Sequence, residues 1–172
     1  EIVYHIKPFA ELSVGGAACG SFAARTGSST SSSMSRRSMP MEGSLFSLLW
    51  AECEGQTVGF LRMIPRGIAY AEPSIGRVCV ARTYRRRGIC REMVSRAIGY
   101  MVREWRAEAI RISAQSYLIP FYESFGFEVV SDEYLEAGIP HKKMLFAWIG
   151  NMGEKREACG EKNRRTCFSP AL

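Results

Sequence analysis

The chain has 172 residues, of which 47% are hydrophobic and 23% are charged, and its formal net charge is +6. This length and composition predict one domain with a continuous hydrophobic core. No apolar run is long enough to cross a bilayer, and residues 1–7 lack the basic start and apolar core of a signal peptide. The six cysteines form no Cys-x-x-Cys pair and lie far from both histidines, so we expect reduced thiols in a cytoplasmic setting and no metal site.

Much of the positive charge lies in a turn near residues 85–91 and in the last twenty residues. A basic domain can bind nucleic acid, but an anionic small molecule at the turn and a solvated tail explain the charge equally well. We therefore treat polynucleotide binding as the minority interpretation. The expected partners include neither nucleic acid nor a membrane.

Two segments depart from the globular pattern. Residues 15–40 are rich in Ser, Gly and Ala and have almost no large apolar residue between Phe22 and Met34. Such a segment buries too little surface to offset the entropy lost on ordering, which predicts disorder. It is either a genuine insert or the product of a shifted reading frame, and the sequence leaves both open. The polar composition of residues 151–172 predicts a disordered basic tail, so residues 1–150 are expected to form a single domain.

Between these segments the hydrophobic periodicity predicts an α/β fold. Strands are expected over residues 46–52, 57–64, 74–80, 109–114, 127–130 and 143–148, and helices over residues 88–106 and 118–125. Glu54-Gly55 is the expected turn of a hairpin, and Gly126 is the expected cap that ends the second helix. The first helix should connect two parallel strands through a right-handed crossover.

The segment from Val80 to Arg91 runs from a strand through a basic turn into the long helix. The first turn of a helix leaves backbone N–H groups without partners, and their partial positive charge suits a phosphate or pyrophosphate. Gly88 would let such a ligand approach the main chain closely. The alternative is a solvated arginine cluster, but cations have the wrong sign for a helix start, which favours an anionic ligand. Neither a Walker loop nor a dinucleotide fingerprint fits the glycine spacing.

Three motifs together resemble the GNAT superfamily of acyl-CoA-dependent N-acyltransferases. Residues 85–90, Arg-Arg-Arg-Gly-Ile-Cys, resemble its Arg/Gln-x-x-Gly-x-Gly/Ala pyrophosphate loop, except that Cys90 stands where the family prefers Gly or Ala. Residues 121–127 resemble its Phe-Tyr-x-x-Phe-Gly-Phe turn, and residues 134–144 resemble the Gly-Ile-Pro-His segment of the ElaA-like branch. The resemblance covers about residues 48–148. It implies the GNAT fold, a mixed twisted sheet with helices on both faces.

The resemblance also implies the chemistry. Acetyl-CoA would lie where the strand over residues 75–80 diverges from the strand over residues 109–114, and its acetyl group would pass by direct attack to a primary amine of a small molecule or a protein. Tyr122 matches the family's general acid for the departing thiolate, although an aromatic packing role is the alternative. The implied cofactor-binding residues are Val78, Val80, Arg85, Arg86, Arg87, Gly88, Ile89, Cys90 and Arg91.

The acceptor side is less defined by the sequence. Glu133, Glu136 and His141 are candidate bases by their position after the cofactor core, and water could relay the proton instead. Glu133 and His141 are also expected to bind the acceptor, with Gly138-Ile139-Pro140 as a turn that shapes its pocket. A competing hypothesis is an acyl-CoA-binding module with a damaged acceptor lobe, which Cys90 and residues 15–40 motivate. The sequence leaves open whether the chain is a monomer or a homodimer.

Overall fold

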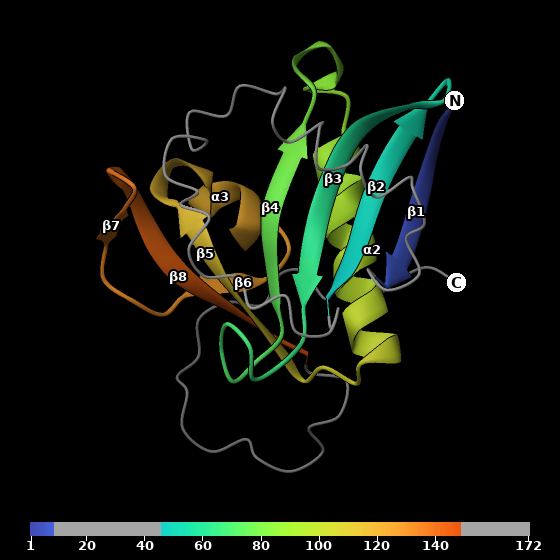
Figure 1. Ribbon diagram of the computed structural model, residues 1–172. Coiled ribbons are helices and arrows are strands. Elements are labelled where there is room, and N and C mark those ends of the chain that lie inside the picture. Colours follow the sequence, from blue (N-terminus) through green and yellow to red (C-terminus); the bar gives the residue numbers. More distant parts are fainter. Residues whose placement is uncertain (9–45, 149–172) are drawn as a thin grey trace.

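The computed structural model describes residues 1–8 and 46–148, and the expectations for residues 15–40 and 151–172 lie outside this part of the chain (Figure 1). The described strands form one sheet in the order β1-β2-β3-β4-β5-β8-β6, with β7 paired to β8. The strands are β1 (Ile2–Pro8), β2 (Ser47–Cys53), β3 (Gln56–Ile64), β4 (Ser74–Val80), β5 (Ala109–Gln115), β6 (Phe127–Val129), β7 (Tyr134–Glu136) and β8 (Ile139–Ala147). The helical segments are η3 (Arg82–Tyr84), α2 (Ile89–Glu104), η4 (Ser116–Leu118) and α3 (Ile119–Glu123).

The sheet is mixed, as predicted. Strands β1 to β4 pair with their neighbours in antiparallel fashion, β4 and β5 are parallel, and β8 pairs antiparallel with β5, β6 and β7. Glu54 and Gly55 connect β2 to β3 with φ angles of 52° and 77°. Positive φ at both central residues is what a two-residue hairpin turn of the favoured twist requires. The predicted hairpin is therefore confirmed.

Helix α2 packs on one face of β2, β3 and β4 through a single apolar stripe. Met93, Val94, Ala97 and Met101 are fully buried on this stripe. Their spacing of three and four residues places them on one side of a helix, and burying that side stabilises the helix more than its intrinsic propensity does. A Cβ added to Gly59 of β3 would lie only 3.1 Å from Met93 Cε, so a glycine lets the helix approach the sheet closely.

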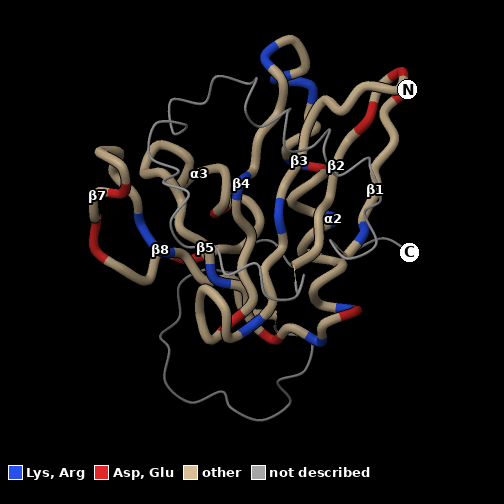
Figure 2. The backbone as a smooth tube through the Cα atoms, in the orientation of Figure 1, with Lys and Arg blue, Asp and Glu red and all other residues tan. Residues whose placement is uncertain are grey.

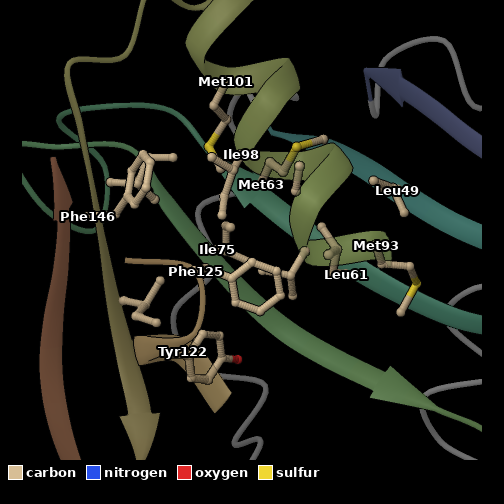
Figure 3. Close-up of a cluster of buried hydrophobic side chains, with 14 of the residues drawn as sticks. Leu49, Leu61, Met63, Ile75, Met93, Ile98, Met101, Tyr122, Phe125 and Phe146 are labelled. Carbon is tan, nitrogen blue, oxygen red and sulfur yellow. The ribbon is translucent and has the colours of Figure 1, made fainter. Parts of the chain in front are cut away.

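Helix α3 belongs to the same core. Tyr122 of α3 and Phe125, which follows α3, share one buried cluster with Ile75 of β4 and Met93 of α2 (Figure 3). Arg91 of α2 places its guanidinium 5.7 Å from the centre of the Phe121 ring of α3, which ties the two helices together. The two described α-helices therefore share one face of the sheet, and the predicted helices on its other face would fall outside the described residues.

The opposite face of the sheet is divided by strand. Over β2 and β3 it carries a second apolar cluster that includes Leu48 and Phe60. Over β5 and β8 it is polar, because Ser113 alternates with the buried Ile112 and Ala114, and Lys143 is the pairing partner of Ser113. The boundary between the apolar and polar halves falls between β4 and β5.

Several predicted boundaries are wrong. Strand β8 begins at Ile139 rather than at Lys143, so Ile139 and Pro140 belong to a strand and the turn is formed by Ala137 and Gly138, with φ angles of 52° and 77°. The long helix spans Ile89–Glu104, and the short one is a 3-10 turn followed by Ile119–Glu123. Strands β1 and β7 were not predicted, and three-residue β7 is too short to show a period.

No helix within residues 1–8 and 46–148 combines the length and apolarity that a membrane crossing would need. Within the same ranges, no group of three or more His, Cys, Asp or Glu side chains is arranged to hold a metal ion.

Replacing Leu61 by alanine should destabilise the protein strongly. Leu61 on β3 is 0% exposed inside the core, so truncation removes apolar contacts and leaves a cavity that costs about 2–5 kcal/mol. Leu135→Ala is the matched control, because Leu135 is 71% exposed and its loss should cost about 0.5 kcal/mol or less. Urea unfolding of both variants measures the difference. Equal free energies of unfolding would contradict this placement of β3.

Candidate active site

The parallel strands β4 and β5 separate almost as soon as they meet. Their only paired residues are Ser74 and Arg111, and the Arg111 N–H donates to the Pro73 carbonyl at 2.9 Å. Beyond this point β4 continues to Val80 with β3 as its ladder partner, while β5 continues with β8. The facing edges of the two strands are therefore outside any ladder, and such edges bind extended chains that carry amide groups.

A bulge marks the place where β4 leaves β5. Arg77 has a φ angle of 56°, and Arg77 and Val78 together lie opposite the single residue Leu61 of β3. Extra residues of this kind bend a strand and re-aim its backbone and are frequent beside active sites. The bulge therefore turns the backbone of Val78 at the start of the gap between the strands.

The basic turn follows directly from β4 and ends in α2. Arg86 and Gly88 have φ angles of 63° and 79°, and α2 begins with the bond from the Glu92 N–H to the Gly88 carbonyl. The N–H groups of Ile89, Cys90 and Arg91 precede this bond and so have no partner inside the helix. A Cβ on Gly88 would meet no atom within 4 Å, so the space before the helix is open.

The arginines of the turn have different environments. Arg85 Nε donates to the Val80 carbonyl at 3.1 Å and braces the turn against β4, while Arg91 Nη1 donates to Ser124 Oγ at 3.1 Å and braces α2 against α3. Arg86 and Arg87 are exposed, and Arg87 lies 5.1 Å from the centre of the Tyr84 ring.

The turn is positively charged without compensation. Within the described ranges, the recorded ion pairs join His5 to Glu52, Arg96 to Glu92 and Arg111 to Glu72, and none involves the arginines of this turn. Figure 2 shows this loop after β4 with basic and no acidic residues. Uncompensated cations beside a helix start provide the electrostatics of an anion site.

Tyr122 lies on the helix side of the gap. It is 8% exposed, and its ring packs edge to face on Phe121 and Phe127 at centroid distances of 5.2 and 5.8 Å. Burial raises the pKa of its phenol above the ordinary value, and the neighbouring Cys90 raises it further. The phenol is therefore neutral at physiological pH and can donate a proton, while its ring also has the packing role considered from the sequence.

Cys90 points toward the core and Tyr122 rather than into solvent. Its side chain packs against the main hydrophobic cluster, and burial raises the pKa of its thiol to about 11 although Arg91 opposes the shift. The extra bulk expected from cysteine in the Gly/Ala position therefore lies beside α3. Among the described residues, Cys53, Cys79 and Cys90 form no disulfide.

The residues expected on the acceptor side lie in the hairpin of β7 and β8 or immediately before it. Glu133 accepts a hydrogen bond from Ser116 Oγ at 2.7 Å and is exposed. His141 is buried, with Nδ1 2.8 Å from the Ile139 carbonyl, so it fixes the hairpin locally. The structure places both residues near the polar half of the sheet, His141 as the pairing partner of Gln115 and Glu133 beside Ser116.

Sequence reasoning missed two side chains at the centre of this polar half. Ser113 Oγ lies 2.6 Å from Tyr134 Oη and donates to Glu136 Oε2 at 3.0 Å. The outward position of Ser113 could have been found from the alternation along β5. Tyr134 could not, because its contact depends on the unpredicted strand β7.

Residues 21–147 match the family model described as an acetyltransferase (GNAT) domain. The chain belongs to the GNAT acetyltransferase family. Among curated relatives, a UPF0039 protein of Synechocystis is 38% identical over 91 residues, which are 53% of this chain and 59% of that protein. Protein ElaA of Escherichia coli is 36% identical over 67 residues, which are 39% of this chain and 44% of ElaA. The chain thus spans about half the length of these two relatives.

Solved GNAT structures agree with this fold over most of the chain. An acyl-CoA N-acyltransferase from Pseudomonas aeruginosa superposes with a TM-score of 0.76 at 24% identity and covers 86% of this chain and 100% of its own. Escherichia coli ElaA superposes with a TM-score of 0.73 at 23% identity and covers 85% of this chain and 99% of its own. At these identities the likeness is one of fold, and it confirms the predicted GNAT architecture. The ElaA-like character is supported by the sequence identity to ElaA.

The Cys90 thiol should resist alkylation in the folded protein. With a pKa of about 11, its thiolate fraction near pH 8 is about a hundred-fold or more below that of an unfolded cysteine with a pKa of about 8.5. Iodoacetamide labelling read by peptide mass spectrometry should therefore be slow in native protein and fast in urea. The native rate should rise steadily as the pH approaches 11. Equal native and unfolded rates would show that Cys90 is not buried.

Proposed function

We propose that this GNAT protein is an N-acetyltransferase that moves an acetyl group from acetyl-CoA to a primary amine of a small molecule or a protein. The observation that carries the proposal is the separation of β4 from β5 after one residue pair, with a bulge at Arg77 and a basic helix start at the end of the same strand. This combination offers an unpaired strand edge for an amide-containing chain and an anion site at its end.

The residues present fit acetyl-CoA. The side chains of Arg86 and Arg87 and the first N–H groups of α2 would hold its pyrophosphate, because that space is open at Gly88 and the charge there is uncompensated. The backbone of β4 from Val78 to Val80 would hold its pantetheine amides. The acetyl group arrives as a thioester, which is the reactive bond of the reaction.

The side chains do little of the chemistry beyond positioning. A backbone N–H at the bulge would stabilise the oxygen on which negative charge develops, and the fixed strand would hold the amine near the carbonyl. Tyr122 would protonate the departing sulfur, since its phenol is neutral and α3 holds it rigidly. Arg85 and Arg91 would act mainly by bracing the turn through their bonds to Val80 and Ser124.

The second candidate is an acyl-CoA-binding module without turnover. Its support in the structure is the position of Cys90, whose side chain packs on the same cluster as Tyr122 and near enough to affect the pKa of that phenol. The two candidates differ in one measurement, the release of free CoA thiol from acetyl-CoA in the presence of a panel of primary amines. Amine-dependent release supports the enzyme, and binding without release supports the module.

Reversing the charge of the turn should weaken acetyl-CoA binding. Arg87→Glu removes an exposed cation and adds an anion beside the helix start, and Gly88→Asp adds a carboxylate in the open space. We expect at least about a ten-fold rise in Kd by calorimetry for each variant, equivalent to about 1.4 kcal/mol. Arg103→Glu, in the last turn of the same helix, makes the same charge change away from the turn and should bind normally. Normal affinity of both turn variants would refute the anion site.

Removing the Tyr122 hydroxyl should separate binding from turnover. Tyr122→Phe keeps the ring that packs on Phe121 and Phe127, so acetyl-CoA affinity and thermal stability should stay close to those of the wild type. Turnover should fall by about 100- to 10,000-fold, the range for a positioned general acid. Steady-state rates under conditions where chemistry is limiting provide the test. Wild-type turnover in this variant would leave Tyr122 with a packing role alone.

A further inference from the structure

Three side chains on the polar half of the sheet form a continuous chain of hydrogen bonds. Tyr134 Oη lies 2.6 Å from Ser113 Oγ, and Ser113 Oγ lies 3.0 Å from Glu136 Oε2. Tyr134 and Ser113 are half-buried, whereas Glu136 is exposed. The chain therefore leads from the interior of the polar face to solvent.

The direction of these hydrogen bonds follows from their chemistry. An ionised carboxylate can only accept, so Ser113 must donate its single hydroxyl proton to Glu136. Ser113 then has no proton left for the other bond, and Tyr134 must be the donor to Ser113. The phenolic oxygen of Tyr134 retains a lone pair that can accept a proton from a third group.

The chain of bonds begins where β5 leaves β4. Ser74 and Arg111 are the paired residues of these parallel strands, so Ser113 would be level with Gly76 if the ladder continued. Gly76 immediately precedes the bulge at Arg77. Ser113 also faces away from the helix side, because Ile112 and Ala114 are buried in the core beneath α2 and α3. It lies at the narrow end of the gap, on the side opposite Tyr122.

Lys143 and Tyr70 lie beside this chain of hydrogen bonds. The Lys143 ammonium from β8 lies 5.7 Å from the Tyr70 ring centre and 5.8 Å from that of Tyr134. Burial, and then the neighbouring Tyr134 and Glu136, raise the pKa of the Tyr70 phenol, which keeps Tyr70 neutral.

Three more titratable groups, Arg111, Glu72 and His141, border the cluster without entering the hydrogen-bond chain. Arg111 is committed to a two-bond ion pair with Glu72 at 2.8 and 3.0 Å. The His141 ring lies 6.2 Å from that of Tyr134, and its Nδ1 is 2.8 Å from the Ile139 carbonyl. Lys143 is thus the cation that lies over the Tyr134 ring.

We propose that Tyr134, Ser113 and Glu136 form the proton relay that deprotonates the acceptor ammonium, an inference that rests on the proposed acetyltransferase function. The ammonium gives one proton to Tyr134 Oη, the Tyr134 proton moves to Ser113 Oγ, and the Ser113 proton moves to Glu136. The products are a neutral amine, whose lone pair is free to attack, and a neutral Glu136 carboxylic acid. Solvent then removes the proton from Glu136, because this side chain is exposed.

This assignment selects among the three candidate bases. Glu133 is bonded to Ser116, which follows β5 and lies beyond the level of the bulge. One ring nitrogen of His141 faces a carbonyl of its own hairpin, so the residue serves the local fold. Glu136 alone of the three connects through hydroxyl groups to the narrow end of the gap.

Turnover as a function of pH tests the relay. Glu136→Gln keeps an oxygen that can accept from Ser113 but removes the base, and Tyr134→Phe and Ser113→Ala each interrupt the chain. Acetyl-CoA and three probe amines, spermidine, phenethylamine and a peptide with a free α-amino group, are assayed, and the best probe is used throughout. Glu128→Gln, an exposed carboxylate change on β6, is the matched control. Calorimetric acetyl-CoA affinity and thermal unfolding check that each variant is folded.

Each relay variant should lose about 100-fold or more in kcat/KM near neutral pH while retaining acetyl-CoA affinity. The loss should shrink by about ten-fold per pH unit toward the pKa of the amine, because the free amine then needs no base. A variant that only disturbs the fold would not recover in this way.

The outcomes separate the relay from the function. Wild-type turnover that persists in Glu136→Gln or Tyr134→Phe, or a loss that is independent of pH, would overturn the relay and leave the enzyme intact. A pH-reversible loss in Glu133→Gln with none in Glu136→Gln would also overturn it. Absence of wild-type turnover with every probe would overturn the acetyltransferase proposal and the relay together.

Discussion

The separation of two adjacent parallel strands is the constraint on which the structure depends. Backbone N–H and C=O groups in the middle of a sheet are normally paired, and leaving them unpaired is costly unless water or a ligand satisfies them. Here β4 and β5 share one residue pair and then diverge. Each strand must therefore form its backbone hydrogen bonds with its other neighbour. Strand β4 is held by β3, and β5 is held by β8 over seven consecutive pairs from Ala109–Ala147 to Gln115–His141.

The core on the helix face makes this arrangement stable. Met93 and Met101 of α2 and Ile110 of β5 belong to one cluster, so the helix connects the two halves of the sheet across the gap. Arg91 and Arg85 reinforce the connection, because one joins α2 to α3 and the other joins the turn to β4. Arg85 and Arg91 thus contribute hydrogen bonds as well as positive charge. These bonds stabilise a turn whose cations are otherwise unfavourable at a helix start.

The sequence predicts those parts of the fold that local patterns determine. The stripe from Ile89 to Met101 predicts α2, the Glu54-Gly55 turn predicts the first hairpin, and Arg87-Gly88 predicts the helix start. The separation of β4 and β5 has no local signal, since a strand that pairs and one that diverges have the same alternation. It follows from the resemblance to GNAT proteins and from the structure.

The same distinction applies within the candidate site. Tyr122 and the basic turn lie in contiguous motifs, so their positions could be inferred before the fold was known. The contacts among Ser113, Tyr134 and Glu136 require β5 to pair with β8 and β8 to pair with β7. The β7–β8 hairpin is local, but the β5–β8 pairing joins residues that are distant in the sequence. The sequence named Glu133, Glu136 and His141 as candidate bases and favoured a pocket-shaping role for His141, whereas the pairing of the strands shows that Glu136 is bonded to Ser113.

The two faces of the gap then have complementary chemical properties. On the helix face, burial keeps the phenol of Tyr122 protonated, which suits a group that donates a proton. On the opposite face, an exposed carboxylate connects through two hydroxyl groups to the same gap, which suits a path that removes one. Acyl transfer to an amine needs both, because the nucleophile loses a proton as the leaving sulfur gains one. A sheet that opens between β4 and β5 can supply them from opposite sides, so that the donor and the acceptor of protons do not neutralise each other directly.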